Sequence, residues 1–208
     1  MLFAGIITDT VDKLDRFSSH WWFLLIILAI AFFDSVIPIV PSETCVIIGG
    51  VAASLHNQNI VLVVAFAAVG AFLGDNTAYL IGQRASAYFE RRAERKPKFK
   101  AKLDWATSQI ADRGGPLLIT ARFIPGGRTA LTLASGITKQ PHKWFVKWVA
   151  VAATIWAIYA AALGYIGGKA FKDNHTAAFI VAFALALAIN GIIELVRHFR
   201  KKKPAPAI

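Results

Sequence analysis

The 208-residue sequence contains one cysteine, Cys45, and few charged residues for its length. A single cysteine excludes an internal disulfide bond and a metal centre built from several thiolates. Charged residues make up 17% of the chain, against about 25% in soluble globular domains, whereas hydrophobic residues make up 56%. This composition excludes an ordinary soluble domain and predicts a single membrane domain over residues 1–208.

Histidine and acidic residues are also sparse. The five histidines are scattered, and no two have the spacing of metal ligands on one helix face, so we expect no metal and no other cofactor. Lysine and arginine number 23, against 12 acidic residues. Because most of this basic excess lies in short segments beside apolar runs, the positive-inside rule explains it better than nucleic-acid binding does.

The first long apolar stretch is too short to cross a bilayer. It runs only from residue 23 to residue 33, whereas a span needs about 20 residues. Two acids and two prolines interrupt it before it resumes at 45–55: Asp34, Pro38, Pro41 and Glu43. Proline breaks a helix, and irregular backbone at membrane depth survives only inside protein or along a cavity. Segment 21–54 is therefore predicted to be a re-entrant broken hairpin; one long kinked span is the alternative.

Longer apolar segments predict transmembrane helices at 60–82, 144–168 and 176–197. Basic segments follow the first and the last of these, at 84–98 and 198–208, and the positive-inside rule places both in the cytoplasm. The first is predicted to be a linker and the second a tail. This topology leaves the N-terminus outside.

A second broken hairpin between residues 114 and 137 makes the chain an internal repeat. Units 8–83 and 99–168 each contain an amphipathic interfacial helix, a broken hairpin and a full span, in inverted orientations. The expected fold is an all-α polytopic membrane protein: an inverted repeat of interfacial helix, re-entrant broken hairpin and transmembrane helix, plus a C-terminal transmembrane helix.

Five charges fall in segments predicted to lie at membrane depth: Asp34, Glu43, Asp75, Arg122 and Arg128. Each costs about 3 kcal/mol at a helix centre unless it is compensated. Mutual pairing alone would be a structural explanation. However, the acids all belong to the first unit and the arginines to the second, and this separation favours a functional site.

The second hairpin carries a candidate phosphate site. Arg122 and Arg128 flank a helix break at Pro125, with Gly126 and Gly127 beside it. Arginine can hold a phosphate through two parallel hydrogen bonds and keeps its charge at any relevant pH. Glycines allow backbone amides to approach an anion. The spacing of the two arginines is by itself a weak indication of a phosphate site. The indication is more specific here because the arginines lie in a broken hairpin that is predicted to face the Asp34 and Glu43 carboxylates of the first hairpin.

Another cluster lies on the span at 60–82. Asp75, Tyr79 and Gly82 are spaced to share one helix face, and we expect Asp75 to orient an arginine. Gly70 and Gly74 form a small-residue pair that is typical of close helix packing.

The runs 34–43, 74–82 and 122–128 together resemble the DedA family, also called the SNARE-associated or VTT-domain family. The resemblance implies a polytopic protein of the bacterial cytoplasmic membrane with two opposed re-entrant hairpins. Family members recycle undecaprenyl phosphate, some depend on the proton-motive force, and eukaryotic relatives scramble phospholipids. The family's paired acids correspond to Asp34 and Glu43, and its arginine pair to Arg122 and Arg128.

We therefore expect a non-enzymatic flippase for undecaprenyl phosphate, with Arg122 and Arg128 on the phosphate. Asp34 and Glu43 are expected to couple transport to protons. A non-specific phospholipid scramblase and a proton-coupled exporter of small ions or drugs are the alternatives. A lipid phosphatase or transferase would need a nucleophile, and neither hairpin tip contains a histidine. The expected partners are a membrane lipid and protons, without nucleic acid; the sequence leaves homo-oligomerisation open.

Overall fold

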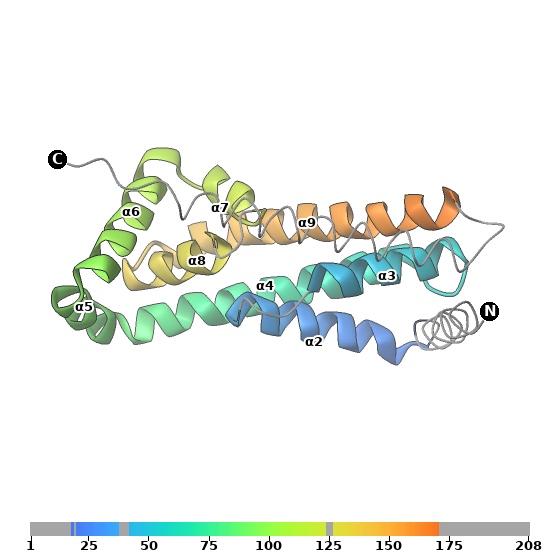
Figure 1. Cartoon of the computed structure of the whole chain (residues 1–208), viewed down its shortest axis with the longest axis horizontal. Coiled ribbons are helices and arrows are strands. Elements are labelled where there is room, and N and C mark those ends of the chain that lie inside the picture. The colour runs from blue at the N-terminus through green and yellow to red at the C-terminus, as the bar shows by residue number, and fades with distance from the viewer. Residues whose placement is uncertain (1–17, 19, 38–41, 124–126, 171–208) are drawn as a thin grey trace, which may run out of the picture.

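The computed structural model describes residues 18, 20–37, 42–123 and 127–170, and every regular element in these ranges is a helix (Figure 1). The helices are α2 (Trp22–Val36), α3 (Ser42–Ser54), α4 (Ile60–Arg84), α5 (Ser86–Arg95), α6 (Pro97–Arg113), α7 (Pro116–Ala121), α8 (Gly127–Ile137) and α9 (His142–Ala170). The interfacial helix predicted at the start of the first unit, residues 8–19, and the transmembrane helix predicted at 176–197 fall almost entirely outside the described residues. Pro38, Pro41, Pro125 and Gly126 also fall outside them.

Within the described part of the chain, two helices, α4 and α9, are long and apolar enough to cross a membrane. They contain 25 and 29 residues, with mean hydropathies of 1.8 and 1.9 over their most apolar windows. They run side by side along the length of the molecule (Figure 1). Their outward sides expose large apolar residues, which include Val61, Leu73 and Ile81 on α4 and Val151, Ile158 and Ile166 on α9. Such surfaces suit contact with lipid chains.

The first broken segment forms two shorter helices. α2 packs along α4, and α3 packs along α9 (Figure 1). With 15 residues, α2 is about 22 Å long, less than the roughly 30 Å thickness of a bilayer core. It ends at Ile37, whose extended backbone is the conformation favoured before a proline. Asp34 and Glu43 lie inside the two helices, in the last turn of α2 and the first turn of α3.

The second broken segment is shorter still, because α7 contains six residues and α8 contains 11. The predicted interfacial helix at 99–112 corresponds to α6, which begins at Pro97, where proline suits the first turn. It ends at Gly114, whose φ of 61° favours glycine. The segment 84–98, which was predicted to be a basic cytoplasmic linker, contains the helix α5.

In the ranges that the structure describes, the buried apolar side chains form two cores, and each contains helices from both predicted units. One core joins α2, α3 and α4 to the middle of α9, whereas the other joins α6, α7 and α8 to Tyr79 of α4 and the N-terminal part of α9. Along α4, Ala71 belongs to the first core and Tyr79 to the second, and Asp75 lies between them. The charged residues therefore occupy the layer between the two cores.

Glycines bring the helices of the two units into close contact. At the crossing of α3 and α9, Gly50 lies against Ala161, and Gly164 lies against Ile47 and Gly50. The crossing of α4 and α8 is similar, because the backbones of Gly82 and Gly136 meet there. Contact this close between backbones requires residues without a Cβ.

Replacing Gly164 by alanine is expected to destabilise the protein by about 1–3 kcal/mol, because the new Cβ would clash with the carbonyl oxygen of Ile47. Thermal unfolding in detergent micelles would measure the loss. Gly167 is a matched control on the same helix, since a Cβ there would meet no atom within 4 Å. Equal melting temperatures for Gly164→Ala and Gly167→Ala would contradict the prediction.

Candidate functional site

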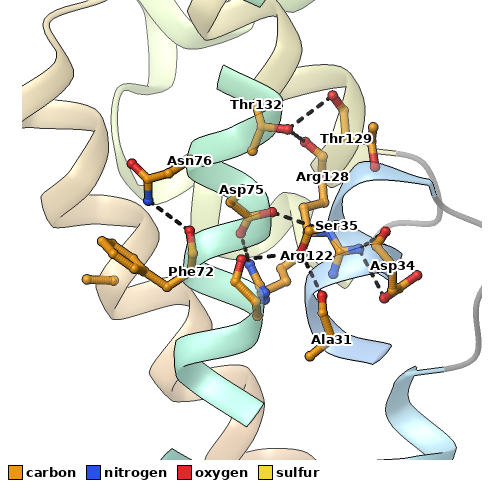
Figure 2. Close-up of polar contacts among 12 residues, drawn as sticks. Ala31, Asp34, Ser35, Phe72, Asp75, Asn76, Arg122, Arg128, Thr129 and Thr132 are labelled. Carbon is orange, nitrogen blue, oxygen red and sulfur yellow. Dashed lines mark hydrogen bonds and ion pairs between the residues drawn. The ribbon is translucent and has the colours of Figure 1, made fainter. Parts of the chain in front are cut away.

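An ion pair connects the two predicted units at the centre of the molecule. Arg122, which follows the last residue of α7, donates from Nη1 to Oδ2 of Asp75 on α4 at 2.5 Å (Figure 2). The exposed fractions of the two side chains are 1% and 0%. A hydrogen bond between oppositely charged groups at this depth is strong, and the loss of either partner would leave an unpaired buried charge. Asp75 therefore orients an arginine here, as the sequence predicted.

A second ion pair is more accessible. Arg128 at the start of α8 donates from Nη2 to Asp34 at the end of α2, both to Oδ2 at 3.0 Å and to the backbone oxygen at 2.6 Å (Figure 2). The exposed fractions are 11% for Arg128 and 16% for Asp34. Ser42 on α3 also donates to Oδ2 of Asp34, at 2.5 Å. One carboxylate thus holds together α2, α3 and α8.

The two ion pairs are neighbours. Nε of Arg128 lies 3.8 Å from Oδ1 of Asp75, which is too far for a direct hydrogen bond. Among the described residues, the buried polar side-chain atoms without a hydrogen-bond partner are Asp75 Oδ1, Arg122 Nε, Arg122 Nη2, Arg128 Nε and Thr129 Oγ1. Unpaired buried polar atoms are rare in folded proteins, yet four of these five belong to the two arginines and Asp75. Three of these atoms are N–H donors, so the cluster can donate hydrogen bonds to the oxygens of an anion.

Glu43 lies apart from the ion pairs. None of the described arginines approaches its carboxylate within 4 Å, although the sequence predicted that both acids of the first hairpin would face the arginines. Its side chain instead lies beside the side chain of Trp156 on α9. The ring of Trp156 also lies 5.2 Å from Cζ of Arg122, which is within cation–π range. Sequence reasoning missed Trp156, because a tryptophan within an apolar span is usually a packing residue.

Tyr79 anchors the side of the site that faces the second core. Its hydroxyl donates to the backbone oxygen of Gln140 at 2.6 Å, and its ring stacks on Phe145 at 4.5 Å between centroids. Asp75, Tyr79 and Gly82 are all buried, which confirms the predicted shared face of α4. The hydrogen bond to Gln140 fixes the turn between α8 and α9 against α4. Gly127 begins α8 next to Arg128 and is partly buried.

The sequence profile of the VTT domain matches residues 40–166, more than half of the chain. The chain belongs to the VTT-domain family. This is the DedA family, and Protein DedA of Escherichia coli (strain K12) is 25% identical over 185 residues, covering 86% of this chain and 84% of that protein.

Two further relatives of this VTT-domain protein are described as membrane proteins. Inner membrane protein YohD of Escherichia coli (strain K12) is 28% identical over 168 residues, covering 78% of this chain and 86% of that protein. Uncharacterized membrane protein slr0232 of Synechocystis sp. (strain ATCC 27184 / PCC 6803 / Kazusa) is 26% identical over 199 residues, covering 93% and 91%. No solved structure matches the chain. Together with the apolar helices α4 and α9, these similarities identify an α-helical membrane protein of this family.

Proposed function

We propose that this VTT-domain protein transports a lipid-linked phosphate, most specifically undecaprenyl phosphate, across the bacterial cytoplasmic membrane. The observation that carries the proposal is the group of unpaired guanidinium N–H donors on Arg122 and Arg128, buried between two apolar cores. A phosphate monoester offers several acceptor oxygens and negative charge to such donors. The prenyl tail would remain in lipid beside the exposed apolar sides of α4 and α9.

The two arginines have different roles in this proposal. Arg122 is held by Asp75 and is almost completely buried, so it supplies fixed positive charge at the bottom of the site. Arg128 is more exposed, and its partner Asp34 occupies the position where a phosphate would bind. The lipid phosphate displaces Asp34 from Arg128, and the released carboxylate then accepts a proton. Glu43 is the second acid that we assign to proton coupling.

The inverted repeat gives a route for this movement. We propose that the hairpin of α2 and α3 and the hairpin of α7 and α8 enter the membrane from opposite faces without crossing it. The glycine contacts of α3 with α9 and of α4 with α8 support the repeat, because each hairpin packs on the span of the other unit. Alternating access would open the charged layer first to one side and then to the other.

Two alternatives differ in measurable ways. A non-specific scramblase would move ordinary phospholipids as readily as a polyprenyl phosphate, and it would not respond to a proton gradient. An exporter of small ions or drugs would leave both lipids untouched. Proteoliposomes that contain labelled undecaprenyl phosphate or labelled phosphatidylethanolamine would distinguish them, and equal movement of both lipids would contradict the proposal.

Arg128→Lys is expected to weaken the binding of a polyprenyl phosphate by roughly 1–3 kcal/mol, because lysine keeps the charge but cannot form the two-pronged contact. Arg122→Lys is expected to act in the same direction. Native mass spectrometry or a thermal-shift titration would measure the affinities. Arg113→Lys, at an exposed position, is the matched control. Unchanged binding in a folded Arg122→Lys, Arg128→Ala variant would overturn the assignment.

The proposed topology places the turn near Asn57 outside and the α5–α6 segment in the cytoplasm, with the C-terminus also cytoplasmic. A Cys45→Ser background that carries a new cysteine at Asn57 is expected to react with a membrane-impermeant maleimide on intact cells. A cysteine at the exposed Lys100 is expected to react only after the cells are opened. The reverse pattern of labelling would show that the orientation is inverted.

A further inference from the structure

Trp156, in the middle of α9, contacts one charged residue from each of the two hairpins. Glu43 at the start of α3 lies beside its side chain, and Arg122 at the end of α7 lies over its ring, with Cζ 5.2 Å from the ring centre. Trp156 itself is 2% exposed. A single side chain on a full-length helix therefore neighbours one acid of the first hairpin and one arginine of the second.

Indole chemistry allows both contacts at once. The indole N–H is a donor only, so it can hold an oxygen of the Glu43 side chain in the plane of the ring. The face of the ring carries partial negative charge and attracts a guanidinium group above it. Phenylalanine would keep the face and lose the donor, whereas leucine would lose both.

Neither charged residue has a full set of other partners. Arg122 has one ion-pair partner among the described residues, Asp75, and its Nε and Nη2 have no hydrogen-bond acceptor. Glu43 has no described basic group within 4 Å; Asp34 on α2 and Arg128 on α8 act on it only at longer range. The indole is thus a principal neighbour of both groups.

We propose that Trp156 is a positioning residue that holds the Glu43 carboxyl group and the Arg122 guanidinium group in fixed relation. The indole N–H keeps Glu43 beside the charged layer, and the ring face keeps Arg122 aimed at the place where a phosphate binds. This inference rests on the proposed function and adds to it a physical link between the hairpins. Proton uptake at the first hairpin and phosphate binding at the second are connected through α9.

Trp156→Leu is expected to weaken the binding of a short-chain polyprenyl monophosphate about tenfold, because it removes the aromatic face from Arg122. Trp156→Phe is expected to restore binding to within about threefold of the parent protein. Its transport of the same lipid in proteoliposomes is nevertheless expected to lose the response to an imposed pH gradient. The response to the pH gradient should fall as far as it does in Glu43→Gln. Trp156→Phe removes the indole N–H that holds the Glu43 carboxyl group in place, and Glu43→Gln removes the group that takes up the proton.

Trp148→Phe is the matched control, because Trp148 lies on the same helix and packs against Gly115 rather than against the charged residues. It is expected to behave like the parent in both assays. Equal binding by Trp156→Leu and Trp156→Phe would show that Trp156 only fills space. A full gradient response in Trp156→Phe or in Glu43→Gln would show that the indole N–H does not serve coupling through Glu43.

The same measurements separate this inference from the proposed function. If the Arg128→Lys and Arg122→Lys variants bind the lipid phosphate like the parent, the transport proposal itself fails. If they lose binding while both Trp156 variants match Trp148→Phe, only the role of Trp156 is overturned. Should Trp156→Leu not fold, the separation of binding from gradient response in Trp156→Phe decides the question.

Discussion

Asp75→Ala is expected to lower the free energy of unfolding by about 3–5 kcal/mol, since it leaves the Arg122 guanidinium as an uncompensated buried charge. Among the described residues, Asp75 is the only acid within 4 Å of Arg122. Equilibrium unfolding in mixed micelles, followed by tryptophan fluorescence, would measure the change. Thr77→Ala on the same helix is the control, because its hydroxyl bonds only to the backbone of its own helix.

The double variant Asp75→Ala, Arg122→Leu tests the cause of this loss. When both charges are replaced by apolar groups, no unpaired charge remains, and the free energy of unfolding is expected to recover most of the difference. Lipid-phosphate binding should not recover, because Arg122 is absent. If the double variant is as unstable as Asp75→Ala, the defect comes from lost packing around α4 and not from the unpaired buried charge.

Asp34→Asn is expected to raise the affinity for a polyprenyl monophosphate by about tenfold, which corresponds to roughly 1.4 kcal/mol. The Asp34 carboxylate competes with the phosphate for Nη2 of Arg128, and asparagine competes less because it is neutral. Asparagine can still accept the hydrogen bond from Ser42, and the contact of Arg128 with the backbone oxygen is unchanged. Titration of the lipid by native mass spectrometry would measure the change.

The same variant is expected to lose the response of transport to a proton gradient. Phosphate binding at Arg128 and proton uptake at Asp34 are coupled, so each favours the other by the same free energy. Asparagine cannot take up a proton in this way, so the coupling is lost. Asp34→Glu is the control, because it restores a titratable group at the same position. Unchanged affinity in Asp34→Asn would show that the carboxylate is not the competitor, and a retained gradient response would exclude it as a coupling group.

The long helices and the charged residues were predictable because both follow from composition along the chain. An apolar run of more than 20 residues is most simply explained by a helix that spans the membrane. On this basis the sequence predicted spans at 60–82 and 144–168, and the structure has α4 and α9 there. The grouping of acids in one unit and arginines in the other correctly indicated that charges meet across the units. The prolines after residue 37 correctly indicated where α2 ends.

The pairing of residues within the site could not be predicted, because it depends on the rotation of each helix about its axis and on how the helices cross. The sequence indicated that Asp75 would orient an arginine, but not that the arginine would be Arg122. Trp156 lies in an apolar span, where a tryptophan is usually a packing residue, and the sequence does not show that its neighbours come from α3 and α7. Helix α5 was missed because its basic residues hid a helical pattern in which Ser86 and Ala93 face inward.

The division of the interior into two mixed cores has a consequence for the order of biosynthesis. The first core includes Trp156, Ala160 and Ala161 of α9, which the ribosome makes more than 70 residues after α4 is complete. Until then, the side of α3 that carries Gly50 has no partner helix. The acid is neutralised earlier, because Arg122, the partner of Asp75, follows the end of α4 by only 38 residues (122 − 84). The nascent chain therefore acquires the partner of Asp75 first, and it completes its first core only when α9 has been made.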